Sequence, residues 1–467
     1  MSYETNSKLV KNGDVFVALK GNYHDGHDYI NEAIKNGASL VICEKKLDLI
    51  VKYKKVKSTH KYLTKVLSKE NNKLTRNMKI IGITGTKGKT TTAMIVYDFL
   101  KKLKINAAYI GTLGVFYKDE HFDLDNTTPD IMTLNKILKI LKENEVTHIV
   151  MEVSSHALNE ERIKGLYFES AVFTNISQDH LDYHKTMKEY FKAKLKILKH
   201  LDGNIIINID DISGKKISKK TKRYISVGKN GSFNITDYKL FPTNSIVTFE
   251  YHYNYYTLSI PFVGKHNIYN YTEAIALLTD LGFELNDLIN LTNSLKPIRG
   301  RNELIKANNG YIVIDYAHSP ASVEETLKTY NELKKGKIIT IIGCGGNRDK
   351  SKRPIMGKIA LEKSDYVIFT SDNPRDEDPK EIIKEMTNNL SSNNYEVIID
   401  RKKAIKKGVK LLKKDDYLLI LGKGHETYQI IKNQKYHFDD KEEVLRIISW
   451  FFYDFINHIS KFFVYLF

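Results

Sequence analysis

The sequence is poor in cysteine, proline and tryptophan, with two, eight and one of these among its 467 residues. Cys43 and Cys344 cannot form the disulfide framework of a small secreted protein, so we expect a reducing compartment. The first residues contain no apolar core segment, which argues against a secretory signal peptide. No uncharged apolar run reaches the roughly 18 residues that a membrane-spanning helix needs. These absences together predict a cytoplasmic protein.

Signatures of nucleic-acid binding are also missing, although the chain is basic. It has 73 Lys and Arg against 56 Asp and Glu, a net charge of +17. The lysines are spread along the whole chain, and neither zinc-ligand spacing nor an aromatic RNA-binding motif accompanies them. This distribution favours a solvated lysine-rich surface that can also attract anionic metabolites. We therefore expect small-molecule substrates, no nucleic-acid partner and a monomer.

The length predicts about three domains. Strand-like runs at 79–84, 148–153, 171–174 and 204–209 alternate with helical segments, including 90–103, which implies a mostly parallel sheet covered by helices. After Arg299, five further strand candidates (311–315, 338–343, 366–370, 396–400 and 417–421) alternate with helices such as 322–333 and 401–412. The predicted fold is α/β, with a central P-loop ATPase domain and a C-terminal Rossmann-like domain. The expected domains are 1–76, a shortened N-terminal domain, then 77–298 and 299–448.

The last residues, 449–467, form a tail with nine aromatic side chains in its final 18 positions. An interfacial amphipathic helix, a packing appendage and a segment without a selected role all agree with this composition. Lys and Arg are sparse for an interfacial helix, so we expect no membrane association.

A glycine-rich turn follows the predicted strand 79–84 and opens the predicted helix. At a helix N-terminus the backbone N–H groups are suited to bind a polyphosphate. Lys89 can reach the β- and γ-phosphates, and the Thr90 hydroxyl can bind Mg²⁺. Ile83 stands where a strict P-loop has its first glycine, but the strand–loop–helix context still predicts an ATP site. Its expected residues are Gly85, Thr86, Lys87, Gly88, Lys89, Thr90 and Thr91.

Another candidate metal ligand ends a neighbouring strand. The run His148–Glu152 is apolar in its middle and finishes in a carboxylate. Such a strand end is structural in most proteins, but together with Lys89 and Thr90 it predicts that Glu152 is a magnesium ligand.

These residues, read with several further segments, resemble the Mur ligase family over nearly all of residues 5–448. The motifs are those of members that add the third residue of the peptidoglycan peptide. The shared segments are GTKGKT at 85–90, NTTP at 126–129, EVSSH at 152–156, FTN at 173–175, DHLD at 179–182, GKHN at 264–267, GRNE at 300–303, DYAH at 315–318, GCGGNRDK at 343–350, DNPR at 372–375 and GKGHE at 422–426. The resemblance implies three domains, ATP and Mg²⁺.

For the nucleotide-linked substrate, the resemblance implies contacts to UDP-MurNAc-L-Ala-D-Glu. Ser7 matches the serine of a family element that contacts the UDP group. Relative to typical members, about twenty residues before that element are absent, which predicts a shortened first domain. The implied substrate contacts are Ser7, Thr127, Thr128, Ser155 and Arg162.

The resemblance also assigns catalytic and metal-binding roles. Lys194 falls on a lysine that family members carry as a carbamate, which helps to hold a second Mg²⁺. His180 becomes a magnesium ligand, and Arg301 and Asp315 contact ATP. Without the resemblance, Lys194 and His180 would be interpreted as an ordinary helix lysine and a structural histidine. The implied catalytic residues are Lys89, Lys194 and His180, and the implied metal ligands are Thr90, Glu152, His180 and Lys194.

The DNPR segment is the most informative about the amino acid that is added. meso-Diaminopimelate differs from lysine by a second carboxylate, which a planar guanidinium can bind through two hydrogen bonds. In the family, DNPR accompanies diaminopimelate. For Arg375 the other interpretation is a surface arginine in a turn. The implied diaminopimelate contacts are Arg348, Asp372, Asn373, Pro374, Arg375, Gly422 and Glu426.

The implied activity is an ATP-dependent amide ligation in peptidoglycan precursor synthesis, and hence in cell-wall biogenesis, cell shape and division. Two alternative enzymes are the same ligase using L-lysine and a folylpolyglutamate-type ligase, and the NTTP and DNPR segments argue against both. A further alternative, which is not an enzyme, is a nucleotide-binding protein that has lost catalysis.

Overall fold

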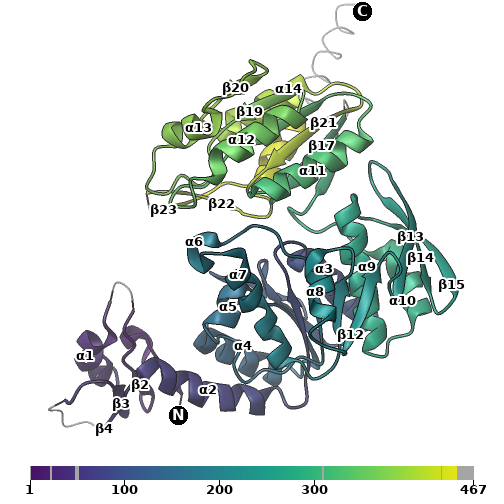
Figure 1. The fold of residues 1–467 in the computed structure, drawn as a ribbon. Coiled ribbons are helices and arrows are strands. Elements are labelled where there is room, and N and C mark those ends of the chain that lie inside the picture. The colour runs from purple at the N-terminus through teal and green to yellow at the C-terminus, as the bar shows by residue number, and fades with distance from the viewer. Residues whose placement is uncertain (1, 22–23, 48–51, 308–309, 433, 450–467) are drawn as a thin grey trace, which may run out of the picture. The chain divides into compact units, whose positions relative to one another are not determined.

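The computed structural model describes residues 2–21, 24–47, 52–307, 310–432 and 434–449 (Figure 1). The aromatic tail beyond Ser449 lies outside the described residues. The chain divides into two compact units, and each is described by itself. The first unit comprises Met1–Gly85, Val96–Phe173 and Lys188–Ile206, and the second comprises Thr86–Ile95, Thr174–Met187 and Ile207–Phe467.

A small parallel sheet opens the first unit. Its strands lie in the order β1 (Tyr3–Glu4), β2 (Val15–Val17), β3 (Leu40–Cys43) and β4 (Tyr53–Lys55). Because successive side chains of a strand point to opposite faces, this sheet buries apolar residues on both sides. One face packs on α1 (Ile30–Lys35), and the other packs on α2 (Thr59–Leu74) and the start of α4 (Ile131–Glu143).

A larger sheet forms the rest of the first unit. Its strand order there is β8 (Glu120–Phe122), β7 (Gly114–Tyr117), β6 (Ala107–Gly111), β9 (His148–Glu152), β5 (Lys79–Thr84), β10 (Ser170–Phe173) and β11 (Ile205–Asn208). The strands β6, β9, β5 and β10 are parallel, whereas β7 and β8 add antiparallel hairpins. The parallel part places the ends of β5 and β9 at the same edge, where ligands bind in α/β sheets.

In the second unit the same sheet becomes largely antiparallel, so the predicted mostly parallel arrangement holds for the central strands and is wrong for this edge. β12 (Tyr224–Gly228) is parallel to β13 (Phe233–Leu240), which is followed by antiparallel β14 (Ser245–Tyr251) and β15 (Asn254–Ile260). Connections of four residues (241–244) and two residues (252–253) join the last three strands, and such short connections permit only antiparallel pairing. Nearby helices are α8 (Ile212–Ser218), α9 (Lys265–Asp280) and α10 (Leu285–Leu291).

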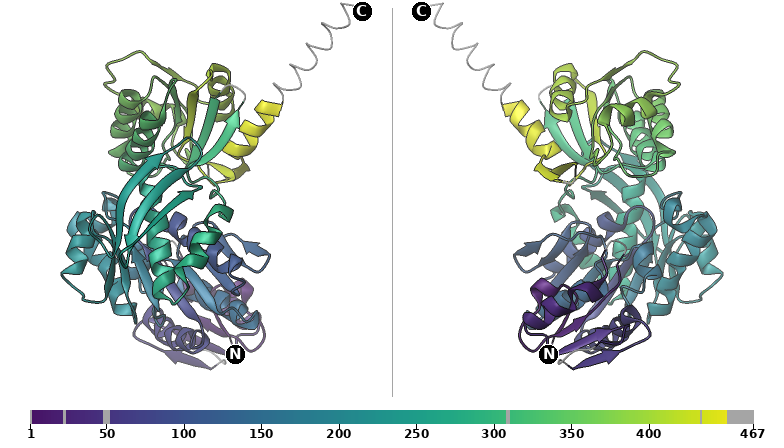
Figure 2. Two further views of the ribbon diagram at one scale, coloured as in Figure 1. Left: turned by 90° about the vertical axis from the view of Figure 1, so that its right-hand side faces the viewer. Right: turned by 90° about the vertical axis from the view of Figure 1, so that its left-hand side faces the viewer.

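The C-terminal sheet of the second unit has helices on both faces. Its strand order is β16 (Glu303–Ala307), β17 (Gly310–Asp315), β21 (Asp416–Leu421), β18 (Ile338–Ile342), β19 (Tyr366–Phe369) and β20 (Tyr395–Val397). Only β16 is antiparallel to its neighbour. Helices α11 (Pro320–Leu333), α12 (Lys352–Lys363) and α13 (Pro379–Thr387) cover one face. The other face packs on α14 (Arg401–Leu411) and on helical residues 440–449, drawn yellow in Figure 2.

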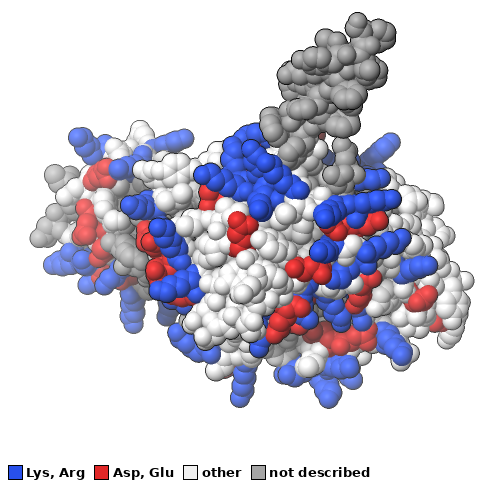
Figure 3. Space-filling view, turned by 90° about the horizontal axis from the view of Figure 1, so that it is seen from above, with Lys and Arg blue, Asp and Glu red and all other residues white. Residues whose placement is uncertain are grey.

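The remaining helices, short 3₁₀ turns and strands are α3 (Lys89–Lys102), α5 (Ser155–Asn159), α6 (Leu181–His184), α7 (Met187–Lys194), η1 (Ser7–Leu9), η2 (Gly26–Tyr29), η3 (Leu195–His200), η4 (Thr292–Ser294), β22 (Tyr428–Ile431) and β23 (Gln434–His437). Among the described residues, no helix is both long and apolar enough to span a bilayer. On the face in Figure 3, Lys and Arg side chains are spread widely, with Asp and Glu between them.

Candidate active site

The phosphate loop connects β5 to α3. Thr86 N donates to the carbonyl oxygen of Asn175 at 3.0 Å, and Lys87 N donates to the Asn175 side-chain oxygen at 3.0 Å. Asn175 returns a bond from its amide nitrogen to the Lys87 carbonyl at 3.1 Å. The FTN segment at 173–175 therefore braces the loop.

Gly88 adopts a φ of +82°, and a Cβ atom there would lie 2.3 Å from the side-chain oxygen of Asn270 on α9. Glycine is required at this point because any larger residue would collide with α9 and favour another backbone conformation. Lys89 Nζ lies inside the loop and donates to the Thr86 carbonyl at 2.9 Å. The loop thus has the compact geometry that a polyphosphate site needs.

Two predicted ATP residues of the third domain lie in the second unit with the loop. Arg301 Nη2 donates to Thr90 Oγ1 at 3.1 Å, and the Arg301 guanidinium stacks over the Tyr316 ring at 4.5 Å. Asp315 accepts a bond from the Asn302 backbone N–H at 2.7 Å. Thr90 and Arg301 are therefore brought together, while Asp315 is tied to the turn that follows Arg301.

Glu152 ends β9 with a fully buried side chain in the first unit. Its carboxylate accepts bonds from the Tyr109 hydroxyl, from Thr112 N at 2.9 Å and from Thr112 Oγ1 at 3.1 Å. These hydrogen bonds offset the free-energy cost of burying the carboxylate away from water. Tyr109 and Thr112 stand in no recognisable motif, so the sequence did not predict them as partners of Glu152.

Three of the predicted substrate contacts gather beside Glu152. Thr128 Oγ1 bridges Glu152 O and Ser154 N at 2.9 Å each, and Arg162 Nη1 donates to Thr128 O at 2.9 Å. Thr127 reaches the same place through a 3.0 Å contact between its hydroxyl and that of Thr112. Ser155, the first residue of α5, is 1% exposed. Ser7 instead donates to Glu32, in the small N-terminal sheet domain.

Lys194 is the last residue of α7, and His180 directly precedes α6, both after β10. Lys194 is 1% exposed, and its Nζ donates to the carbonyl of Gly85 at 2.7 Å, so this amine lies at the start of the phosphate loop. His180 Nε2 lies 3.7 Å from an Asp179 carboxylate oxygen. Burial acts to raise the pKa of Asp179, but the positive charges of His180 and Lys89 help to hold it below its ordinary value.

The four predicted metal ligands are distributed over both units. Glu152 and Lys194 belong to the first unit, and Thr90 and His180 belong to the second. Among the described residues, no group of three or more His, Cys, Asp or Glu side chains is placed to hold a metal ion. Thr90 and Glu152 offer the oxygen donors that Mg²⁺ prefers, whereas His180 and the Lys194 amine offer nitrogen.

The predicted diaminopimelate contacts meet at the ends of β19 and β21. Asn373 Nδ2 donates to Glu426 Oε2 at 2.8 Å, and Arg375 Nη1 donates to the Gly346 carbonyl at 2.9 Å. Gly422 has a φ of +113°, and a Cβ atom there would lie 2.5 Å from Asp372 Oδ2. Asp372 and Asn373 are 7% and 3% exposed. The structure thus gathers Asp372, Asn373, Pro374, Arg375, Gly422 and Glu426 into one cluster.

Arg348 is exposed on the loop after β18. A Cβ atom built on Gly345 would lie 2.9 Å from Arg375 Nη1 and 3.8 Å from Arg348 Cγ, so both arginines border Gly345. The Arg375 guanidinium and the side-chain stem of Arg348 therefore lie near the same glycine.

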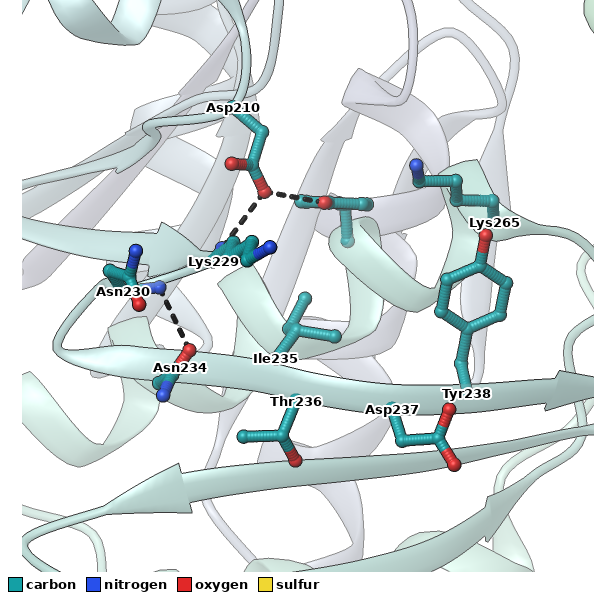
Figure 4. Close-up of a pocket in the computed structure, with 10 residues that line it drawn as sticks. Asp210, Lys229, Asn230, Asn234, Ile235, Thr236, Asp237, Tyr238 and Lys265 are labelled. Atoms are coloured by element: carbon teal, nitrogen blue, oxygen red, sulfur yellow. Dashed lines mark hydrogen bonds between the residues drawn. The ribbon is translucent and has the colours of Figure 1, made fainter.

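A further polar cavity lies between the β12–β13 connection and the N-terminus of α9 (Figure 4). Its volume is about 580 Å³. Asp210 accepts bonds from Tyr269 Oη at 2.6 Å and Lys229 N at 2.9 Å on one side of it. None of the residues that the sequence analysis assigns to ATP, substrate or metal lines this cavity. It is lined by Asp210, Lys229, Asn230, Asn234, Ile235, Thr236, Asp237, Tyr238, Lys265 and Tyr269.

Three family models match successive parts of the chain: "Mur ligase family, catalytic domain" over residues 2–78, "Mur ligase middle domain" over 83–278 and "Mur ligase, glutamate ligase domain" over 300–424. A relative from Clostridium botulinum, UDP-N-acetylmuramoyl-L-alanyl-D-glutamate–2,6-diaminopimelate ligase, is 38% identical over 96% of this chain and 94% of its own length. The chain belongs to the Mur ligase family. The predicted family and its three-domain α/β fold are thereby confirmed.

Other family members agree with this assignment. The ligase of the same name from Aquifex aeolicus is 40% identical over 95% of this chain and 92% of its own length. A solved structure of a ligase with that name has a TM-score of 0.68 and 28% identity, covering 96% of this chain and 94% of its own. The MurF ligase from Thermotoga maritima in complex with ADP shares the fold, with a TM-score of 0.65, 22% identity and 96% coverage of each chain. The chain is an ATP-dependent ligase of this family.

Lys423 is a residue that sequence reasoning missed, although it stands inside the GKGHE segment. Its side chain is fully buried, and its Nζ contacts Asn373 Oδ1 at 3.2 Å and Glu426 Oε2 at 3.1 Å. A buried lysine in a loop is unusual because the charged form loses hydration. The position of Lys423 between Gly422 and Glu426 was the available signal.

Proposed function

We propose that the chain adds meso-2,6-diaminopimelate to the D-Glu residue of UDP-MurNAc-L-Ala-D-Glu, with ATP as co-substrate. The observation that carries this proposal is the cluster of Asn373, Arg375 and Glu426. The guanidinium of Arg375 suits the second carboxylate of diaminopimelate, and the carboxylate of Glu426 suits its distal ammonium. Relatives that are named as diaminopimelate ligases support the same choice.

The proposed chemistry forms one amide bond at the expense of one ATP. The γ-phosphoryl group of ATP moves to the D-Glu side-chain carboxylate, giving an acyl phosphate and ADP. The neutral amine of diaminopimelate then attacks the acyl carbon, and the tetrahedral intermediate loses phosphate and a proton. In this reaction the protein mainly positions the reactants and stabilises developing charge.

Particular residues are proposed for each part of the first step. Lys89 neutralises negative charge on the transferred phosphoryl group, and the loop N–H groups bind its oxygens. Thr127, Thr128, Ser155 and Arg162 hold the UDP-linked substrate beside Glu152, and Ser7 contacts its UDP group. Arg301 and Asp315 contact ATP from the proposed third domain, 299–448, which follows the proposed domains 1–76 and 77–298.

Thr90, Glu152, His180 and a carbamate on Lys194 are the proposed ligands of Mg²⁺. When bound, the metal would offset charge on the phosphate oxygens. The Lys194 amine at Gly85 is deeply buried, and it is the group that would add to CO₂. The carbamate would carry negative charge at the same place and supply oxygen ligands.

Phosphate release tests the proposal. The purified chain is incubated with ATP, Mg²⁺ and UDP-MurNAc-L-Ala-D-Glu, with either meso-diaminopimelate or L-lysine as the acceptor. Phosphate release with diaminopimelate but not with L-lysine supports the proposal and the role of Arg375. Release with L-lysine instead would keep the ligase class and contradict the assigned amino acid. Release with neither acceptor, despite normal ATP binding, would indicate a nucleotide-binding chain without catalysis.

A further inference from the structure

Lys423 lies at the centre of the amino-acid cluster, with its side chain fully buried. Its Nζ contacts Asn373 Oδ1 at 3.2 Å, Glu426 Oε2 at 3.1 Å and the Tyr428 carbonyl oxygen. These three acceptors come from the loop after β19, from the GKGHE segment and from β22. One ammonium therefore joins the segment 423–428 to Asn373, which is 50 residues away in the sequence.

The contacts of Lys423 decide how Asn373 and Glu426 are oriented. Asn373 Oδ1 faces Lys423 and also accepts from Ile430 N at 2.9 Å, which directs its amide nitrogen to Glu426 Oε2 at 2.8 Å. Glu426 Oε2 thus receives two donors. Among the described residues no hydrogen bond to Glu426 Oε1 is recorded, so this oxygen has capacity for a further donor.

The charge of Lys423 also acts on the ionisation of Glu426. Burial raises the pKa of Glu426 above its ordinary value, Lys423 opposes that rise, and Asp372 adds to it. Arg401 and Tyr316 are further charged or titratable groups that interact with Glu426. A carboxylate that must bind an ammonium has to be ionised, and an adjacent buried cation favours that form. Removing the cation would leave a buried carboxyl group that protonates at higher pH.

We propose that Lys423 is a positioning residue that orients Glu426, directly and through Asn373, to receive the distal ammonium of the incoming amino acid. This inference rests on the proposed function, because it assigns Glu426 to that ammonium. Lys423 itself contacts no reacting atom. It acts through Asn373 and Glu426, and it makes the site selective for acceptors with a second amine.

The test compares Lys423→Met, which keeps much of the side-chain volume and removes the charge, with wild type. We expect the KM for diaminopimelate to rise at least about tenfold, with KM for ATP and kcat changed less than about threefold. The rise should be larger at pH 6.5 than at pH 8.5, because Glu426 loses ionisation first at low pH. A purely structural role would not produce this pH dependence.

Two further variants separate the possible outcomes. Lys423→Arg keeps the charge but not the geometry, so it should show an intermediate KM with the wild-type pH dependence. Lys414→Met removes an exposed lysine outside the site and should leave both KM values unchanged. An unchanged KM for diaminopimelate in Lys423→Met, or equal increases for both substrates, would overturn the proposal.

If Lys423→Met does not fold, as judged by loss of ATP binding, Lys423→Arg decides. A raised KM for the amino acid alone supports the positioning role, and an unchanged KM contradicts it. Failure of the proposed function would be seen separately, as absence of diaminopimelate-dependent phosphate release in the wild-type protein. If wild type accepts L-lysine instead, the same comparison is made with L-lysine, which carries the same distal ammonium.

Discussion

At the scale of single residues, the clearest assignments are those in which a buried polar group has defined partners. Arg375 is held in a left-handed backbone conformation with a φ of +52°, and its backbone bonds to Ile430 and Lys432 anchor it against β22. Its guanidinium also donates to the Gly346 carbonyl at 2.9 Å, which reduces the freedom that the side chain must lose on binding a carboxylate. Its guanidinium is thus positioned in advance, which favours affinity.

Changing Arg375 to Ala should raise the KM for diaminopimelate at least roughly 30-fold, because losing one partner of a buried charge pair costs about 2–5 kcal/mol. The KM for ATP should stay within about twofold. Steady-state phosphate release measures both constants. Arg76→Ala, at an exposed arginine in the first unit, is the matched control. Equal loss for both substrates would argue against the assigned role.

Glu273 on α9 gives a residue-scale prediction about stability. It is 1% exposed, and neither carboxyl oxygen has a hydrogen-bond partner in the described residues. Burial, reinforced by nearby Asp211, raises its pKa well above the usual value. The folded protein therefore keeps Glu273 protonated, while the unfolded chain ionises it above about pH 4.5. Consequently, the free energy of unfolding falls as pH rises above that value.

Glu273→Met should remove this pH-dependent loss and raise the free energy of unfolding by about 1–3 kcal/mol at pH 8, with a smaller gain at pH 4. Urea unfolding at the two pH values measures the difference. The exposed Glu332→Met provides the control and should show no such pH dependence. A gain of equal size at both pH values would contradict the raised pKa.

At the scale of elements, one ion pair fixes the last described helical segment to the C-terminal sheet. Arg401 at the start of α14 pairs with Asp440 through bonds of 2.8 and 2.7 Å, and both side chains are fully buried. Arg401 Nη2 also donates to the Leu421 carbonyl at 3.1 Å. The pair therefore connects α14, the end of β21 and residues 440–449.

Asp440→Asn should destabilise the protein by about 3–5 kcal/mol, because it leaves a buried guanidinium without its counter-charge. The double change Arg401→Met with Asp440→Leu should recover most of that loss, since apolar replacements of buried ion pairs are often tolerated. Denaturant unfolding measures both. The exposed pair Lys358–Glu362 is the control, and Lys358→Ala should cost under about 1 kcal/mol. Similar costs at the two pairs would contradict the argument.

At the scale of the whole molecule, ATP binding should stabilise the fold. A ligand at 100 times its Kd adds about 2.7 kcal/mol to the free energy of unfolding if it binds only the folded state. ATP with Mg²⁺ should therefore raise the melting temperature of wild type, and Lys89→Ala should remove most of that increase. Without ATP, the variant should melt near wild type. Chelating Mg²⁺ should stop phosphate release, and persistent release would contradict the need for a metal.

The sequence predicted most parallel strands and their helices within one or two residues. The run 79–84 coincides with β5, and α3 begins one residue before the predicted start. Apolar runs followed by helical periodicity determine such elements locally. The β13–β15 meander was not predicted, because its strands carry many exposed polar and aromatic side chains. Strand β20 ends at Val397, earlier than expected, since pairing with β19 stops there.

By itself, the sequence determined the type of fold, the phosphate loop and the residue types at each motif, because these depend on local order and spacing. Only the tertiary structure decided which of these groups meet. Lys194 reaches Gly85 across 109 residues, and Lys423 reaches Asn373 across 50. Such pairs depend on the order of the strands, which brings distant residues together. Burying a polar group without a partner costs free energy, so the partners of these groups are determined by the whole fold and not by a local segment.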